Sequence, residues 1–335
     1  AIAHVFQHLR HGLELPDQPV GRLPRPRHLG QKLQAGASMA TWVEAAGMDW
    51  TVRKTPIQYY ADRAKTDLRT DDEAVMLVRS DTGARLGIVS PNYNIVQPGE
   101  VLEFFRDLTE TQGFTLETAG TMFGGRRYWA LAKITEAQMA GWDKIGAYLL
   151  FTTSADGSFA SEARETAIRV VCNNTISMAV AQIPGKHYVK INHRQAFDAK
   201  AVKAQLELGA EHFQAFKELA TLMTKAKVSE MAAEQFVTEL LRPVAADADE
   251  TEQQEASRRP RGLDKIMALF GGLGLGATQK GSAGTAWGLV NACTEYCDHH
   301  ATAKTDSHRL ANAWYGNGSI FKVAAFNKAC AELVG

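Results

Sequence analysis

The chain has 335 residues, and its 37 basic and 37 acidic side chains give a formal net charge of zero at pH 7. With 45% hydrophobic and 22% charged residues, the composition is that of a globular protein rather than a disordered or fibrous one. Zero net charge weighs against a dedicated nucleic-acid protein, which usually has a basic excess. The sequence has no run of 18 apolar residues, so it predicts no membrane span.

Residues 1–35 are rich in proline and arginine and follow no hydrophobic period, so we expect an extended N-terminal arm. The first 30 residues lack the charged-then-apolar layout of a signal peptide. Four cysteines in 335 residues do not make a disulfide framework. A reducing cytoplasm is therefore the simplest compartment.

The first regular elements follow the arm. Ser38 is a plausible N-cap for a short helix. The alternating residues 51–60 predict a strand, in which Pro56 indicates an edge or a bend. A charged loop over residues 61–73 should lead into a β-hairpin that turns at Asp81-Thr82-Gly83.

A single helix is expected within the β-rich part, with Pro98 in its first turn, where a missing N–H costs little. Its apolar stripe has helical spacing and is made of Val101, Leu102, Phe104, Phe105 and Leu108. Two more strand pairs follow, one around Gly124-Gly125 and one around Asp156-Gly157, a dipeptide typical of hairpin turns.

The hydrophobic period changes after the strand IRVVC. Asn174 or Thr175 should cap a helix that begins there. Residues 185–194 look extended, and residues 196–228 have the apolar spacing of one long amphipathic helix. Another helix should begin after Ser229, which is a plausible N-cap.

These elements predict an α+β fold with a β-rich antiparallel core of hairpins and one interposed helix over residues 36–195. A mainly helical C-terminal region should follow over residues 196–335, with a mobile loop near 244–262.

The glycine-rich stretch from Gly271 to Gly284 invites a nucleotide-binding interpretation. It does not match GxxxxGK[ST], because Lys280 is followed by Gly281, and it does not match GxGxxG after a strand. A flexible loop between helices is the simpler interpretation. A phosphate contact through backbone N–H groups is the alternative.

Cys293 and Cys297 are four residues apart, so they would share one face of a helix, with His299 close by. Zinc could use such a set, but no CxxC knuckle is present, and two buried cysteines are the simpler interpretation. A nucleophilic Cys172 would need a histidine base, and no local signature supports one. We therefore expect no catalytic residue, no metal and no other cofactor.

A local basic excess stands out over residues 160–203, which carry seven Lys or Arg against three acids. Cations interleaved with aromatic rings can hold phosphates and stack on bases, although ordinary solvated strand ends have the same composition. Arg169 is expected on the less apolar face of its strand. The candidate nucleic-acid-binding residues are Arg126, Arg127, Tyr128, Arg164, Arg169, Lys186, Tyr188, Lys190 and Arg194.

Several ordered stretches resemble one family: YNIVQPGEVLEFF, LETAGTMFGGRRYWALAKI, YLLFTTSADGS, IRVVCNNT and, near the C-terminus, WGLVNACTEYCDHH and RLANAWYGNGSIFKVAAF. They are similar to phage- and plasmid-encoded proteins that carry domain of unknown function 932. The resemblance runs from about Ser38 to the end. It departs at Arg27-His28-Leu29-Gly30, where members carry a Trp-His-Gly-Leu-Gly-like segment. It implies a mobile element in a bacterial cytoplasm, where proteins often handle DNA.

The expected function is non-enzymatic DNA binding, with single-stranded DNA favoured, and the chain would act as a homo-oligomeric single-strand annealing protein. One alternative is a structural or protein-interaction factor of a mobile element, for example in defence evasion. A cysteine- or zinc-dependent enzyme is the other alternative.

Overall fold

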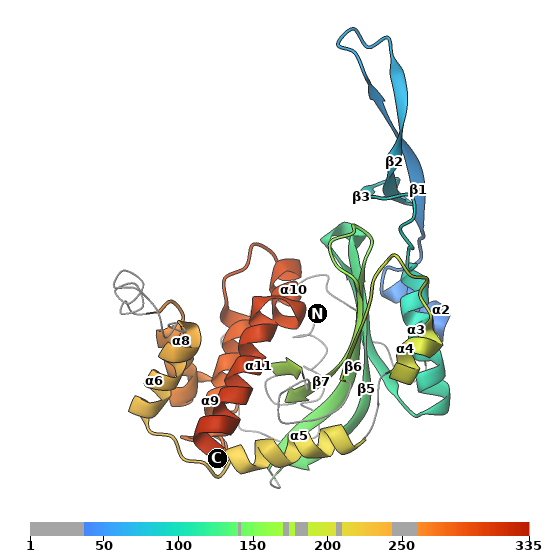
Figure 1. The fold of residues 1–335 in the computed structure, drawn as a ribbon. Helices are drawn as coiled ribbons and strands as arrows, with labels where there is room; N and C mark the ends of the chain where they lie inside the picture. The colour runs from blue at the N-terminus through green and yellow to red at the C-terminus, as the bar shows by residue number, and fades with distance from the viewer. Residues whose placement is uncertain are drawn as a thin grey trace. The chain divides into compact units, whose positions relative to one another are not determined.

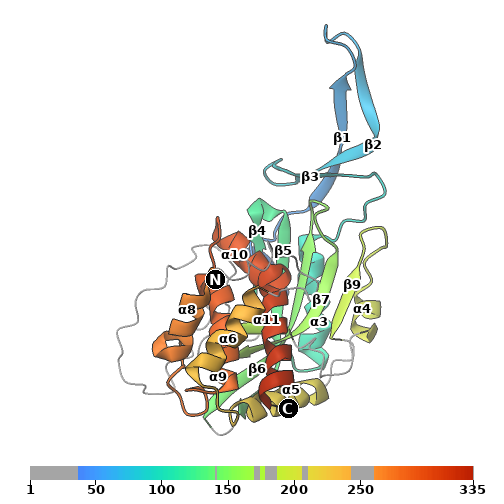
Figure 2. The same cartoon turned by 60° about the vertical axis from the view of Figure 1, so that its left-hand side comes forward.

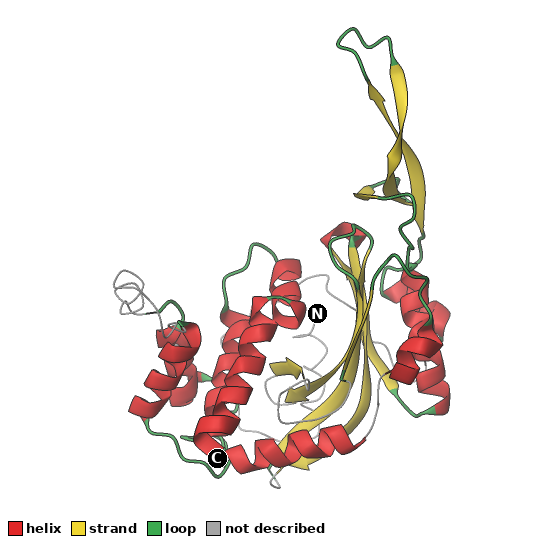
Figure 3. Cartoon of the chain, viewed as in Figure 1, coloured by secondary structure: helices red, strands yellow, loops and turns green. Residues whose placement is uncertain are grey.

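The computed structural model describes residues 37–139, 142–169, 174–177, 187–205, 210–242 and 260–334. Within them, antiparallel strands dominate the first half and helices the second (Figures 1 and 3). This confirms the predicted α+β fold. The expected N-terminal arm, Cys172, Lys186 and most of the loop near 244–262 lie outside the described residues.

The helices and strands follow one another without internal repetition. The strands are β1 (Val52–Tyr60), β2 (Leu68–Arg79), β3 (Arg85–Val89), β4 (Thr115–Met122), β5 (Arg127–Met139), β6 (Asp143–Ser154), β7 (Ser161–Arg169), β8 (Asn174–Ser177) and β9 (Tyr188–Ile191). The α-helices are α2 (Met39–Ala45), α3 (Pro98–Thr111), α4 (Ala199–Gln205), α5 (Ala210–Met223), α6 (Glu230–Leu241), α8 (Leu263–Ala268), α9 (Ala286–Glu295), α10 (Asp306–Tyr315) and α11 (Asn317–Ala329). Short 3-10 or π turns are η2 (Phe123–Gly125), η3 (Leu269–Leu273), η4 (Tyr296–His300) and η5 (Cys330–Val334).

The chain divides into two compact units that alternate along the sequence. Unit 1 consists of residues 1–134, 148–165 and 186–207, and unit 2 of residues 135–147, 166–185 and 208–335. Three of the boundaries fall inside strands β5, β6 and β7. The predicted domain boundary near residue 195 stays a prediction.

The first sheet, in unit 1, has the strand order β1-β2-β3 and is antiparallel (Figure 1). Pro56 lies on the edge strand β1, as predicted, and the register shifts directly after it, so that Pro56 opposes Val75 but Ile57 opposes Asp71. The predicted charged loop over 61–73 is too long. Strand β2 already begins at Leu68, because main-chain pairing with β1 does not require apolar side chains.

The second sheet has the strand order β4-β5-β6-β7-β8, and β9 also pairs with β7. In unit 1, helix α3 packs on this sheet with the predicted stripe, and the rings of Phe104 and Phe151 lie 4.8 Å apart. The helix begins after Gln97, whose capping box with Glu100 satisfies main-chain donors of the first turn. The predicted helix start is thereby confirmed.

Residues 174–177 form a strand rather than the predicted start of a helix. Strand β8 pairs with β7 from Arg169 opposite Asn174 to Thr166 opposite Ser177. The main chain of Thr175 donates to Asp298 Oδ2 at 2.7 Å. The polar residues at this point are typical of a helix cap. Their main-chain groups instead form hydrogen bonds with strand β7 and with the carboxylate of Asp298, which satisfy them without a helix. The expected long helix over 196–228 is described as α4 and α5, with residues 206–209 outside the described part.

The helices of unit 2 surround α9, whose residues Ala286–Glu295 are all buried. Its N-cap Thr285 accepts a hydrogen bond from the main chain of Gly288. Helix α6 begins after the predicted N-cap Ser229. Helices α9 and α11 both contact β8, which ties the C-terminal helices to the sheet portion of the same unit.

Candidate functional site

One group of the predicted residues lies on neighbouring strands of unit 1, where β9 pairs with the first half of β7 (Figure 2). Glu162 opposes Lys190 and Arg164 opposes Tyr188. Directly opposed residues share a face of an antiparallel pair, so these four side chains lie together. The alternate residues Ala163 and Val189 are buried and form the inner face.

The shared face is held together by Glu162. Arg164 Nη2 lies 2.7 Å from Glu162 Oε2, and the Tyr188 hydroxyl donates to Glu162 Oε1 at 2.7 Å. The Arg164 guanidinium also lies over the Tyr188 ring, 5.0 Å from its centroid. Burial, followed by the nearby Glu162, raises the pKa of Tyr188, so its hydroxyl stays protonated. The ring is therefore positioned by charge-assisted contacts.

Solvent reaches this face. Tyr188 keeps 37% of its surface exposed, and both Lys190 and Arg194, in the turn after β9, are exposed. We name Glu162, Arg164, Tyr188, Lys190 and Arg194 the β9 surface. It combines three cations, one carboxylate and one accessible aromatic ring.

Arg126 and Arg127 lie at a different turn of unit 1, where η2 leads into β5. Arg126 is exposed. Arg127 is half-buried, because its guanidinium contacts Ser158 Oγ at 3.0 Å and lies over the rings of Phe123 and Phe159. These contacts fix Arg127 while Arg126 remains available to a ligand.

Tyr128 is in the core of unit 1. Its side chain is 0% exposed, its hydroxyl donates to the Val96 carbonyl, and its ring meets Trp50 edge to face at a centroid distance of 6.1 Å. The adjacent Trp129 is also 0% exposed. A ring enclosed in this way cannot stack on a base, so Tyr128 is not available to a nucleic acid.

Arg169 is in the interior of unit 2, contrary to its expected outward position, and only 3% of it is exposed. Its Nε donates to Asp143 Oδ2 at 2.6 Å. Its Nη2 donates to Ser282 Oγ at 2.8 Å and to Gln279 Oε1 at 3.1 Å. Trp287 Nε1 donates to the same Asp143 oxygen at 3.1 Å. Arg169 is therefore a buried ion-pair residue and is also left out of the interface.

These contacts explain the glycine-rich stretch. Residues 274–284 form the turns between η3 and α9, and the carbonyls of Leu275 and Gly276 accept from the Arg169 guanidinium at 3.5 and 3.4 Å. Close packing requires glycine at one position inside the stretch, Gly281, and at one position just after it, Gly288 in α9. A Cβ on Gly288 would lie 2.0 Å from the Ser282 carbonyl oxygen, and one on Gly281 would lie 2.3 Å from the Trp142 ring. The stretch packs around a cation of the protein itself.

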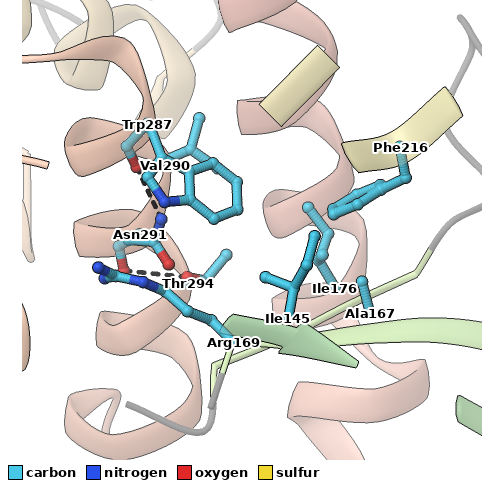
Figure 4. A pocket seen from close by; sticks show the side chains of 9 residues that line it. All are labelled: Ile145, Ala167, Arg169, Ile176, Phe216, Trp287, Val290, Asn291 and Thr294. Atoms are coloured by element: carbon cyan, nitrogen blue, oxygen red, sulfur yellow. Dashed lines mark hydrogen bonds between the residues drawn. The ribbon is translucent and has the colours of Figure 1, made fainter. Parts of the chain in front are cut away.

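A small cavity lies beside Arg169 in unit 2 (Figure 4). Asn291 and Thr294 bring polar groups to it from α9, where Asn291 Nδ2 donates to the Trp287 carbonyl at 2.8 Å and Thr294 Oγ1 to the Asn291 carbonyl at 2.9 Å. Its lining consists of Ile145, Ala167, Arg169, Ile176, Phe216, Trp287, Val290, Asn291 and Thr294. It has room for about one water molecule, which is too little for a substrate.

A second buried ion pair fixes β8. Lys322 of α11 is 1% exposed, and its Nζ lies 2.6 Å from Asp298 Oδ1 and 2.8 Å from Thr175 Oγ1. The residues Asp143, Asp298 and Lys322 were not singled out from the sequence. No local pattern around any of them indicates a partner so distant in the chain.

Two cysteines and two histidines that could act as nucleophiles or metal ligands are also buried. Cys293 and Cys297 are buried, and burial raises the pKa of both thiols, that of Cys297 to about 12. Zinc binds the thiolate, which is disfavoured here. His187 Nδ1 lies 2.8 Å from Glu165 Oε2, and both side chains are buried. His193 Nδ1 lies 2.9 Å from the Asn94 carbonyl oxygen, and burial lowers the pKa of its ring.

Together, the fold and these sites define an α+β protein with antiparallel sheets, an accessible cationic strand surface and buried ion pairs. The chain belongs to the family described as Domain of unknown function (DUF932), whose model matches residues 85–314. This confirms the family that the sequence motifs predicted, over the matched residues. Searches of curated proteins and of solved structures gave no significant match. No helix of the described residues is both long and apolar enough to cross a membrane.

Proposed function

We propose that the protein binds single-stranded DNA at the β9 surface without catalysing a reaction, in the setting of a bacterial mobile element. One observation supports this most: the half-exposed ring of Tyr188 contacts Arg164 on the neighbouring strand, and its own strand carries the exposed Lys190 and leads into a turn with the exposed Arg194. Proteins that bind single strands combine cations along the sugar-phosphate chain with aromatic rings that stack on bases.

The ring favours a single strand over a duplex. In a duplex both faces of each base are covered by neighbouring base pairs, whereas the bases of a single strand can unstack onto a side chain. Arg126 extends the candidate contact set at the other exposed turn of unit 1. Annealing would additionally require two bound strands to meet, which agrees with the expected homo-oligomer.

The salt dependence of the binding affinity should report how many cations of the protein contact phosphates. Each phosphate contact contributes about −0.7 to the slope of log affinity against log salt concentration for a single strand. The three cations of the β9 surface, Arg164, Lys190 and Arg194, would together contribute about −2 to this slope. Fluorescence anisotropy with a labelled oligonucleotide measures this slope directly.

Variants separate the parts of the surface. The double variant Lys190→Ala/Arg194→Ala should weaken binding and reduce the magnitude of the slope by about 1.4, whereas Lys225→Ala, at an exposed turn of unit 2, should change neither. Tyr188→Ala should cost about 1–3 kcal/mol of binding, and Tyr188→Phe should keep most of the affinity because the ring remains.

Replacing Glu162 should strengthen binding, whereas the preceding substitutions in the β9 surface should weaken it. Its carboxylate lies within 2.7 Å of Arg164 and repels phosphates. Glu162→Gln should therefore raise the affinity for the oligonucleotide. Absence of binding at low salt, to one strand or to two complementary strands, would refute the proposal.

A further inference from the structure

One turn of the β9 surface is anchored by a single buried side chain. Residues 192–195 follow β9 in unit 1, on the way to α4 (Figure 2). Within this turn Asn192, Arg194 and Gln195 are exposed, whereas His193 is only 9% exposed. The turn also closes on itself, because the main chain of Gln195 donates to the Asn192 carbonyl at 3.0 Å. The position of Arg194 therefore depends on how its neighbour His193 is held.

His193 is held by the segment that precedes α3. The His193 carbonyl accepts from the main chain of Asn94 at 2.7 Å and from Asn94 Nδ2 at 3.2 Å. The His193 ring stacks on Tyr93, with the ring centroids 4.4 Å apart and an angle of 20° between the planes. The Tyr93 hydroxyl in turn donates to the Ser154 carbonyl at 2.8 Å. The imidazole and the main chain of His193 thus attach the turn to the body of unit 1.

The contacts of the ring define its protonation state. His193 Nδ1 lies 2.9 Å from the Asn94 carbonyl oxygen, which can only accept, so Nδ1 carries the proton of the neutral ring. A second proton would have to bind Nε2. This atom is enclosed and makes no hydrogen bond within the described part of the chain. A charged imidazole would therefore place a desolvated N–H group in the interior, which is costly unless that group reaches water or another partner.

Several neighbouring side chains offer a charged His193 no compensation. Tyr93 stays neutral when His193 titrates, because burial raises the pKa of its hydroxyl to about 12. Arg194, on the same turn, is a cation. On β5, the guanidinium of Arg127 is a second cation and lies over the Phe159 ring, 4.9 Å from its centroid. These groups either carry no charge or repel a charged imidazole.

Other neighbours favour a charged ring but are outweighed. Burial has the largest effect and lowers the pKa of His193 below its ordinary value of 6.5, against the main-chain groups of Asn94 and Phe159 and the Asp156 carboxylate. Asp156 lies in the turn between β6 and β7. In an open turn, with the ring in water, the pKa of the imidazole returns to about its ordinary value. The closed turn therefore loses stability relative to the open turn as the pH falls below about 6.5.

We propose that protonation of His193 opens the turn of residues 192–195 and releases Arg194 from the β9 surface. In the open turn the imidazolium reaches water, and the hydrogen bonds between His193 and Asn94 are lost. The ratio of closed to open turn falls by up to about tenfold for each pH unit below about 6.5. The consequence for DNA rests on the proposed function of the β9 surface, whereas the opening itself does not.

The change is confined to one end of the β9 surface. Strand β9 pairs with β7 as far as Ile191 opposite Ser161, and none of these pairs involves the turn. Tyr188 and Lys190 therefore stay on the paired strand when the turn opens. Acidification should remove one phosphate contact, that of Arg194, and reduce the magnitude of the salt slope by about 0.7.

Hydrogen–deuterium exchange of the full chain without DNA tests the opening. In the closed turn the main-chain amides of Asn94 and Gln195 donate within and to the turn, so they should lose protection between pH 7 and pH 5, after correction for the intrinsic pH dependence of exchange. Peptides from β4 and β5 are the internal reference and should change less. Two variants should abolish this response: His193→Asn, which keeps a donor for the Asn94 carbonyl, and His193→Phe, which keeps a stacked ring. The control His308→Gln, at an exposed histidine of unit 2, should leave it unchanged.

Fluorescence anisotropy with a labelled oligonucleotide tests the effect on DNA. The unaltered protein should bind more weakly at pH 5 than at pH 7, with a salt slope smaller in magnitude by about 0.7, whereas His193→Asn should give equal slopes. Arg194→Ala should weaken binding at pH 7 and have little effect at pH 5, where the turn is already open.

The two measurements separate this proposal from the proposed function. Exchange that does not respond to pH, or that responds equally in His193→Asn and His193→Phe, would overturn the opening of the turn. Tighter binding at pH 5 that depends on His193 would also overturn the proposal, because the charged ring would then contact a phosphate itself. A turn that opens in a protein that binds no DNA at either pH would refute the proposed function and support the opening.

Discussion

Replacing Arg169 with methionine removes the cation of the buried ion pair while keeping a side chain of similar length. Arg169 and Asp143 have side chains that are 2% and 1% exposed, so water does not replace the lost partner. Asp143 would retain hydrogen bonds from Trp287 Nε1 at 3.1 Å and from the main chain of Lys144 at 2.9 Å. Within the described part of the chain, Arg169 is the counter-charge of this carboxylate, and the substitution removes it.

The expected destabilisation follows from these contacts. Breaking one side of a buried ion pair costs about 3–5 kcal/mol of the free energy of unfolding. Arg169 also loses its bonds to Ser282 and Gln279, each with a net value of about 1 kcal/mol, which favours the upper part of that range. A loss of about 4–5 kcal/mol corresponds to a fall in Tm of roughly 8–20 °C for a domain of this size.

Thermal and urea-induced unfolding, followed by circular dichroism, measure this loss. The matched control is Arg194→Met, which replaces an exposed arginine and should change stability by no more than about 0.5 kcal/mol. The double variant Arg169→Met/Asp143→Leu should recover part of the loss, because no unpaired charge remains buried. An Arg169→Met protein that unfolds at the temperature of the unaltered protein would refute the structural role of Arg169.

Three further predictions concern single positions. Gly288→Ala should cost at least about 3 kcal/mol in urea unfolding, because its Cβ would lie 2.0 Å from the Ser282 carbonyl oxygen, whereas Gly271→Ala, with no atom within 4 Å, should change stability by less than about 0.5 kcal/mol. Thr285→Ala removes the N-cap of α9 and should lower the free energy of unfolding by about 1–2 kcal/mol; an unchanged urea midpoint would contradict the capping role. Burial lowers the pKa of His193, so below about pH 6.5 the unfolded chain takes up a proton that the folded chain resists. The folded protein therefore loses stability when the pH falls below this value. Thermal melts at pH 7 and pH 5 should show a smaller loss for His193→Gln than for the unaltered protein; equal losses in the two proteins would contradict this.

Local signals in the amino-acid sequence predict several elements correctly. Ser38 caps a helix, as its position before the apolar residues predicts. The stripe of α3 and the turn at Asp156-Gly157 follow from the helical period and from hairpin chemistry, and both are confirmed. These signals involve residues within a few positions of one another, so they can be recognised without knowing the fold. The ordered motifs also identified the family.

The positions of the polar residues depend on how the whole chain folds and could not be predicted from local sequence. Arg169 has a sequence environment typical of a solvated strand face, but Asp143, Gln279 and Ser282 come to it from distant parts of unit 2 and bury it. Thr175 looked like a helix cap until β7 and Asp298 provided partners for its main chain.

The physical reason is the same in both cases. A buried charge or main-chain group is stable only when its partners are in place, and the partners are set by how the whole chain packs. The same consideration separates the candidate binding residues, since Tyr128 is enclosed while Tyr188, in an equally polar stretch, remains accessible.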